Sequence, residues 1–217
     1  MPSWPEPSAS MQRSQSRWGT RDQQRNLQQA AKRDIFSPVM PEPIKYICSC
    51  CGKEHEDWPA LTFIAPDNYD HLSDEEKEQM GELDSDFCII RDTDQTDRFI
   101  RCTLTQKVTD DCQSLQYGLW VSLSEKSFQD YKDNFNNENH ETKYFGWLCN
   151  SLPDYRFDKH VPTTVITKPG NDRPEIVPHN DFDHPFVHDY YNGITKAEAE
   201  RRIRDMLERI NGAGFND

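Results

Sequence analysis

The sequence predicts a single α+β domain in which about three helices lie on an antiparallel, meander-like sheet. Three observations favour this fold class. From Ile44 onward, hydrophobic runs of strand length alternate with polar turn signals. Two capping-box motifs mark the starts of helices. Successive strands follow one another across short polar turns, whereas parallel pairing would need crossovers of a dozen residues or more.

Each expected strand is an apolar or alternating run that ends at a turn signal. The expected strands cover residues 61–64, 87–90, 99–108, 117–123, 144–149 and 163–167. The first run ends at Pro66, and the second ends in the acidic turn that begins at Asp92. Because strands that are neighbours in sequence pair most simply as antiparallel neighbours, the expected sheet is a meander.

Helix starts are expected at Ser73 and Thr195, because each hydroxyl residue is followed three positions later by a glutamate. The helix after Thr195 carries an apolar stripe at helical spacing and meets a stop signal at Gly212. The residues of that stripe are Ile203, Met206, Leu207 and Ile210. A third helix is expected over residues 127–135, with its aromatic side chains on one face.

Residues 1–39 differ in composition from the rest of the chain. They are rich in Ser, Gln, Arg and Pro, and their six basic and three acidic side chains give a local charge of +3. Few aliphatic side chains are present, so burial cannot offset the entropy of ordering this segment, and we predict a disordered arm. The domain then spans residues 40–212, and residues 213–217 form a short tail. Met1 and Met40 are both possible starts.

The remainder of the chain holds 19 basic and 35 acidic side chains, a charge of −16. Such a body repels a phosphate backbone, so nucleic-acid binding by the folded part is not expected, whereas a basic protein partner is. No run of 18 apolar residues and no secretory h-region occurs, so we expect no membrane span and a cytoplasmic location. The odd number of cysteines, seven, favours metal or free-thiol chemistry over disulfides.

The strongest local motif runs from Cys48 to His55, with the sequence CSCCGKEH. Two cysteines separated by two residues, followed by a glycine, are typical of half of a tetrahedral zinc site. His55 is a third candidate ligand, and Cys88, on an expected strand, is the preferred fourth. Cys149 and His71 are alternatives for that fourth position. The competing interpretations are a turn with idle thiols and a redox motif, and the redox motif is disfavoured because no helix is expected to follow.

A second cluster contains His179, His184 and His188, with Asp181 and Asp183 between them. Three imidazoles and two carboxylates could hold a catalytic metal, which would make the chain a metal-dependent hydrolase. The competing interpretation is a solvated loop in which Asp and His cap local turns.

Several of these motifs also occur in a known family. From Tyr46 to about Ile203 the chain resembles DUF2199, a bacterial domain of unknown function. The matching segments are CSCCGKEH, DFCII at residues 86–90, RFIR at 98–101, GLWVSLS at 118–124, FGWL at 145–148, LPDY at 152–155, HP at 184–185 and GI at 193–194. The resemblance implies one intact domain whose border lies near Met40, and it implies no activity.

The resemblance also bears on individual cysteines and histidines. Cys48, Cys51, His55 and Cys88 fall on positions of the family pattern and so look like the metal ligands. Cys50, Cys102 and Cys112 look peculiar to this chain. His179 and His188 have no clear counterpart in the pattern.

Together these features predict a cytosolic domain with a structural zinc and no catalytic residues, which acts as a protein-binding module of, for example, an immunity type. Its expected partner is a basic protein, because the body is acidic. The metal-dependent hydrolase is the alternative.

Overall fold

The structure is a computed structural model, and it describes residues 45–47 and 54–212. For residues 45–47, 55 and 210–212 it describes the backbone alone. The arm expected over residues 1–39 and the tail expected over 213–217 lie outside the described residues.

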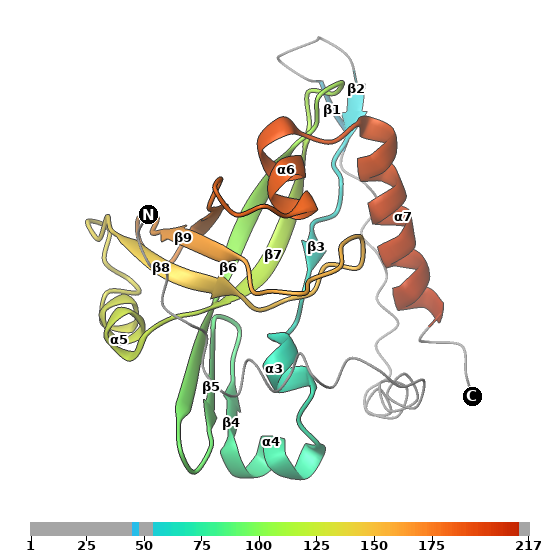
Figure 1. The fold of residues 1–217 in the computed structure, drawn as a ribbon. Coiled ribbons are helices and arrows are strands. Elements are labelled where there is room, and N and C mark those ends of the chain that lie inside the picture. Colours follow the sequence, from blue (N-terminus) through green and yellow to red (C-terminus); the bar gives the residue numbers. More distant parts are fainter. Residues whose placement is uncertain (1–44, 48–53, 213–217) are drawn as a thin grey trace.

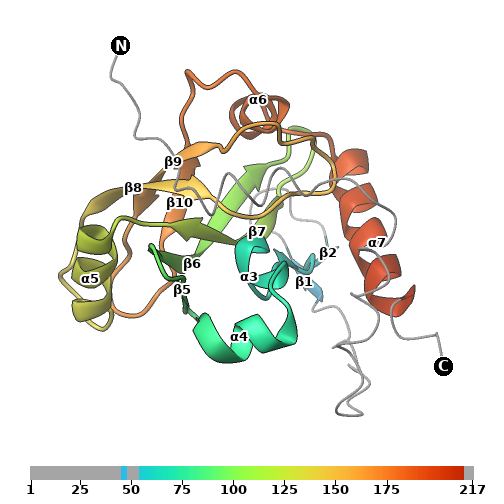
Figure 2. The same ribbon diagram turned by 60° about the horizontal axis from the view of Figure 1, so that its bottom comes forward.

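Five strands close into a barrel. They are β6 (Thr96–Lys107), β7 (Ser114–Ser122), β8 (Lys143–Leu148), β9 (Pro162–Ile166) and β10 (Glu175–Pro178). Each strand pairs antiparallel with the next, and β10 then returns to lie parallel to β6, with Glu175 opposite Thr103. Figure 1 shows β6 and β7 in the middle of the molecule, and Figure 2 labels all five strands.

The expected antiparallel, meander-like sheet is therefore wrong, although most of its antiparallel neighbours are present. The strand that closes the barrel is only four residues long, and no expected strand covered it. Its partner lies 72 residues earlier in the chain, and a period-two pattern carries no information about such a long-range partner.

β6 and β7 extend beyond the barrel and pair with further strands there. β5 (Phe87–Arg91) pairs with the first half of β6, and β4 (Gly81–Leu83) pairs with β5. On the other side, β3 (Leu61–Thr62) lies parallel to β7. A separate hairpin consists of β1 (Lys45–Ile47) and β2 (Glu54–Glu56).

The described part of the chain contains five helices, not the three expected. They are α3 (Asp67–Asp70), α4 (Asp74–Met80), α5 (Glu125–Asp133), α6 (Pro185–Asn192) and α7 (Lys196–Gly212). The Ser73 capping box of α4 is confirmed, because the Ser73 hydroxyl accepts from the Glu76 amide while the Glu76 carboxylate accepts from the Ser73 amide. Figures 1 and 2 both show α5 and α7 on opposite sides of the molecule.

Among the described residues, no helix combines the length and the apolar character that crossing a membrane requires.

The long strand β6 has a hydrophobic cluster on each face, because successive side chains of a strand point in opposite directions. Ile100, Cys102 and Leu104 belong to the main core, together with Val121 and Val165 from other barrel strands. Phe99 faces the other way and joins a smaller core. The other buried members of this core are Cys88, Ile90, Trp120 and Cys149. The two cores hold the barrel and the segment from α3 to β5 together as one body.

Candidate functional site

The negative charge of the chain is concentrated in one part of the structure. Residues 67–97, which include α3, α4, β4 and β5, carry twelve carboxylates and two basic side chains, a net charge of −10. We call these residues the acidic lobe. Figure 1 shows α4 and β4 of this lobe at the bottom, and Figure 2 brings α3 and α4 to the front.

Exposed carboxylates lie on α4, where Asp74, Glu75 and Glu78 all face solvent. At the entrance to the lobe, just before α3, the side chain of Ile64 is 81% exposed. Large apolar side chains with this exposure are rare in the described residues, where Tyr191 at 46% is the other example.

Two carboxylates of α3, Asp67 and Asp70, have raised pKa values. Burial raises the pKa of Asp67, although hydrogen bonds from Ser151 and Asn150 oppose this shift. Burial also raises the pKa of Asp70, and the neighbouring charge of Asp67 raises it further. A cation beside Asp70 would favour the charged form of this carboxylate.

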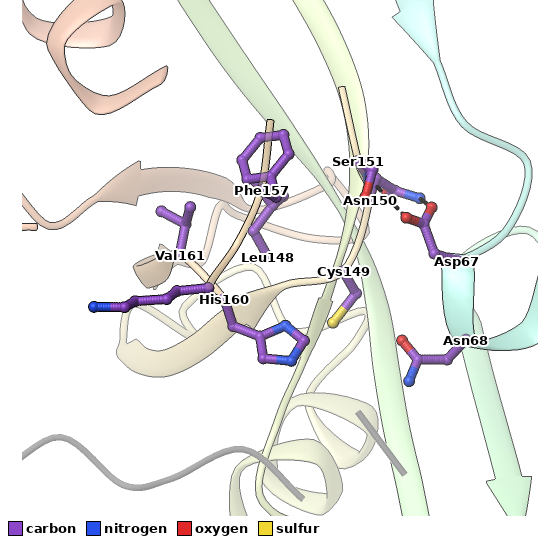
Figure 3. A pocket seen from close by; sticks show the side chains of 10 residues that line it. Asp67, Asn68, Leu148, Cys149, Asn150, Ser151, Phe157, His160 and Val161 are labelled. Atoms are coloured by element: carbon purple, nitrogen blue, oxygen red, sulfur yellow. Dashed lines mark hydrogen bonds between the residues drawn. The ribbon is translucent and has the colours of Figure 1, made fainter. Parts of the chain in front are cut away.

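A small hollow opens between α3 and the segment that follows β8 (Figure 3). Asp67 and Asn68 line it on one side, and Cys149, Asn150 and His160 line it on the other. Its volume is about 30 Å³, which is room for about one water molecule. A hollow of this size does not accommodate an organic substrate.

Two polar side chains at this hollow, Asn150 and Asp67, bond to each other and to the backbone. Asn150 donates to the Ala65 carbonyl at 2.9 Å and to Asp67 Oδ1 at 3.2 Å, and its own oxygen accepts from the Trp120 amide at 2.7 Å. The second oxygen of Asp67 accepts from the Ser151 amide at 2.9 Å. These bonds tie α3 to the end of β7, so the asparagine and the carboxylate serve the fold.

Cys149 is the thiol at this hollow, and its Sγ donates to the Trp147 carbonyl at 3.1 Å. Burial raises the pKa of Cys149 far above its ordinary value, so the thiol stays protonated at neutral pH. A nucleophilic cysteine needs the opposite shift. The arrangement therefore lacks an activated nucleophile.

The structure does not bring the three histidines of the expected metal cluster together. His184 caps α6: its Nδ1 accepts from the Phe186 amide at 3.1 Å and its Nε2 lies 3.0 Å from the Arg156 carbonyl, to which it can only donate. His179 Nε2 lies 3.0 Å from the Thr164 hydroxyl. His188 is 61% exposed and lies beside Asp183.

No group of three His, Cys, Asp or Glu side chains in the described part of the chain is arranged to share a metal ion. The three imidazoles are all described residues, so the hydrolase that was built on them has no support in this geometry.

The expected zinc ligands can be located only in part. Cys48 and Cys51 lie outside the described residues, and of His55 the backbone alone is described, in β2. Antiparallel pairing of Ile47 with Glu54 makes residues 48–53 the connection of the β1–β2 hairpin.

Cys88 lies apart from the described end of this hairpin. Its side chain is fully buried in the smaller core, and burial raises its pKa to about 12. The Glu56 carbonyl accepts from Gln113 at 3.0 Å, in the turn between β6 and β7. Cys88 is opposite Phe99, eight residues and roughly 26 Å along β6 from the end of that strand. The four-ligand zinc site stays a prediction, and Cys88 is its least supported member.

Two other thiols are relevant to this comparison. Cys149, an alternative fourth ligand, belongs to the same buried core as Cys88, whereas Cys112 is exposed and adjoins Gln113 in the β6–β7 turn. Sequence spacing could not indicate that this turn contacts β2, because the contact joins segments 57 residues apart.

Comparison with known proteins gives one match. A family model described as DUF2199, an uncharacterized protein conserved in bacteria, matches residues 47–194. No curated protein and no solved structure matches the chain.

Proposed function

The chain belongs to DUF2199, a family of uncharacterised proteins conserved in bacteria, and we propose that it is a non-catalytic module that binds a basic protein through its acidic lobe. The observation that carries this proposal is the concentration of a −10 charge in residues 67–97. A field of one sign over one part of a surface steers an oppositely charged partner toward it and raises the rate of association.

Two further features support a protein as the ligand. Ile64, at the border of the lobe, offers an apolar contact that a small basic ion would not use. The exposed carboxylates of α4 lie along a helix of seven residues, about 10 Å long. That length matches an array of basic side chains better than a single charge.

The geometry at the Asp67 hollow supports a binding role over a catalytic one. The Cys149 thiol is protonated, and the Asp67 carboxylate is already bonded to Asn150 and Ser151. The hollow has room for about one water molecule. A substrate therefore has no place beside a nucleophile.

The binding proposal is tested by recovery of partners from bacterial cytosol on immobilised protein. Three chains are compared: the wild type, a lobe variant with Asp74→Lys, Glu75→Lys and Glu78→Lys, and a control variant with Asp133→Lys, Glu138→Lys and Glu141→Lys. Both variants change the charge equally, and all six residues are exposed. The wild type and the control are expected to retain the same basic protein at low salt, and the lobe variant is expected to lose it.

Equal recovery by all three chains would contradict a role for the lobe, and so would recovery that does not weaken as the salt concentration rises. Loss of binding in both variants would mean that overall charge, and not the lobe, attracts the partner.

We also propose that zinc stabilises the β1–β2 hairpin through Cys48, Cys51 and His55, with one further ligand completing the tetrahedron. Support comes from the pairing of Ile47 with Glu54, which encloses the CxxC motif between two strands, the arrangement typical of a zinc knuckle. Zinc binding contributes to folding free energy, so a strong chelator is expected to lower the melting temperature.

Single substitutions distinguish the cysteines that bind zinc from those that do not. Cys51→Ser is expected to lower the zinc content and the melting temperature, whereas Cys50→Ser is expected to change neither. Cys88→Ala is expected to keep the zinc, because this thiol is buried in the smaller core. Loss of zinc in that variant would restore Cys88 as the fourth ligand, and equal damage from Cys50→Ser and Cys51→Ser would refute the zinc proposal. The zinc content is measured by metal analysis of the purified full chain, and the melting temperature is measured on the same protein.

A further inference from the structure

Two strands share one edge of β6, and the acidic lobe meets the barrel at the gap between them. β5 pairs with residues 96–100 of β6, and β10 pairs with Thr103 (Figure 2). In the gap, the Arg101 amide donates to the Asp86 carbonyl at 2.9 Å. The Thr103 amide donates to the Pro174 carbonyl at 2.8 Å. The starts of β5 and β10 therefore meet beside Arg101.

The described residues leave the Arg101 guanidinium poorly satisfied. Its Nε is buried and has no hydrogen-bond partner among them, and its Nη1 lies 3.5 Å from the Ser85 carbonyl. A distance of that size is at the outer limit for an N–H···O bond. A guanidinium carries five N–H donors, and burying a charged group is costly unless it is paired. A buried nitrogen of this kind is typical of a place where an ion or an ordered water binds.

A second guanidinium lies beside the first. Arg173 Nη2 is 3.4 Å from the same Ser85 carbonyl, so this nitrogen and Arg101 Nη1 are at most about 7 Å apart. The Asp86 carboxylate accepts from Arg173 Nε at 2.7 Å. The three charged side chains Arg101, Arg173 and Asp86 sum to +1, in a chain whose net charge is −13. The charge at this junction therefore favours an anion.

The pKa of Arg101 lies below its ordinary value. Burial is the main cause, the neighbouring charge of Arg173 lowers the pKa further, and Asp86 opposes both. Asp86 thus does not compensate the second positive charge in full. An anion between the two guanidiniums would favour the charged form of both arginines.

The positions of the two arginines favour a tetrahedral oxyanion. Guanidinium groups match phosphate and carboxylate groups in geometry. A carboxylate has its two oxygens in one plane, whereas a phosphate has oxygens that can face two guanidiniums from different segments. Each charge-assisted bond spans about 2.8 Å and phosphate oxygens are about 2.5 Å apart, so one phosphate can accept from nitrogens about 7 Å apart. The Arg173 side chain is 38% exposed, which leaves the junction accessible from solvent.

We propose that Arg101 and Arg173 bind a phosphate group at the junction of the acidic lobe and the barrel. The group is either free phosphate or the phosphate of a small phosphomonoester. The acidic lobe repels anions, but interactions between exposed charges more than about 8 Å apart are largely screened at physiological ionic strength. This site does not depend on the protein partner proposed for the lobe.

Titration of the full chain, followed by phosphorus NMR in a chloride buffer, tests the site with two probes, inorganic phosphate and phenyl phosphate. The wild type is expected to bind with a dissociation constant on the order of 1 mM. Arg101→Met and Arg173→Met are each expected to weaken binding at least about tenfold, because each removes charge-assisted hydrogen bonds. The matched control is Arg98→Met, which removes the same charge from β6 at a residue paired with Glu125. This control is expected to bind as the wild type does.

The two probes distinguish the sources of the phosphate group. Equal affinities would support free phosphate as a sufficient ligand, and tighter binding of phenyl phosphate would support a phosphomonoester. Binding of neither probe at about 20 mM would overturn the proposal, and so would equal weakening by Arg98→Met and Arg101→Met. If Arg101→Met does not fold, Arg173→Met provides the same test, because the Arg173 side chain is more than a third exposed.

Thermal unfolding gives an independent measurement. Inorganic phosphate at about 20 mM is expected to raise the melting temperature of the wild type and of Arg98→Met by about 3 °C or more relative to chloride. The melting temperature of Arg101→Met is expected to stay unchanged. An equal rise in all three chains would reflect the general exclusion of phosphate from protein surfaces and would overturn the proposal.

Discussion

Arg202 is a buried cation that joins several parts of this fold. Its side chain is 3% exposed, and its guanidinium lies 2.8 Å from Glu198, 3.1 Å from Asp189 and 3.7 Å from Asp154. It also contacts the Tyr117 hydroxyl and covers the ring of Tyr155. These groups belong to α6, α7, β7 and the segment after β8, so one cation joins four parts of the chain.

Arg202→Met is expected to remove the buried cation that Glu198, Asp189 and Asp154 share, while Arg201 still contacts two of these carboxylates. Breaking a buried pair costs about 3–5 kcal/mol, so the melting temperature is expected to fall by about 10 °C. Arg201 is the matched control, because it contacts Asp154, Glu198 and Asp205 while remaining 43% exposed. Arg201→Met is expected to cost less than about 1 kcal/mol. Similar melting temperatures for the two variants would contradict this account.

At the same scale, His184 shows why the histidine cluster was misleading. Its spacing to His188 fits a metal site on a helix, but the same position before Pro185 also fits a helix cap. The structure uses it as the cap, with the ring stacked 4.7 Å from Phe157. Sequence spacing cannot distinguish the two roles, because the stacking partner lies 27 residues away.

At the scale of elements, Glu175 closes the barrel with its side chain. Its Oε1 accepts from the Thr105 amide at 2.8 Å, and its Oε2 accepts from the Thr103 hydroxyl at 2.8 Å and from Lys168 at 2.9 Å. Only one pair of residues is in register between β10 and β6. The carboxylate thus replaces part of the backbone ladder where the parallel strands meet.

Glu175→Ala is expected to accelerate hydrogen exchange at the Thr105 amide and to lower the melting temperature by about 4 °C or more, because the Thr105 amide and the Thr103 hydroxyl lose a charged acceptor. Glu200→Ala, on the exposed side of α7, is the control and is expected to change neither. Unchanged exchange at Thr105 would show that the barrel does not depend on this carboxylate.

The same carboxylate makes the closure sensitive to acid. Burial alone would raise the pKa of Glu175, but hydrogen bonds from Lys168, Thr103 and Thr105 outweigh burial and lower the pKa below 4.5. The folded state therefore favours the charged form. The stability from this group is fully present above about pH 4.5 and is lost as the pH falls through the lowered pKa. Melting curves between pH 6 and pH 3 are expected to show a smaller fall for Glu175→Ala than for the wild type.

Elements with strong local signals were the predictable ones. The alternating pattern located β6 and the capping box located α4, since both signals reside in a few adjacent residues. β10 was missed because four residues carry too short a pattern, and barrel closure was missed because its hydrogen bonds join distant segments. α3 was missed for the same reason as β10, since it is one turn long.

At the scale of the whole molecule, charge is distributed unevenly, because residues 67–97 carry −10 of the −16 that residues 40–217 hold. The total charge can be counted from the composition. The arrangement of the acidic lobe in space cannot, because it depends on the pairing of β4 with β5 and of β5 with β6, which places α4 beside these strands. The zinc site remains a prediction, because Cys48 and Cys51 lie outside the described residues.

The central claim is that the acidic lobe binds a basic protein, and the most direct measurement is the dissociation constant of the recovered partner as a function of salt. The wild type and the control variant with Asp133→Lys, Glu138→Lys and Glu141→Lys are expected to bind at least about tenfold more weakly when the salt concentration rises from about 50 to 300 mM. The lobe variant with Asp74→Lys, Glu75→Lys and Glu78→Lys is expected to bind weakly throughout, with little dependence on salt. Equal dissociation constants for the lobe variant and the wild type at low salt would contradict the account.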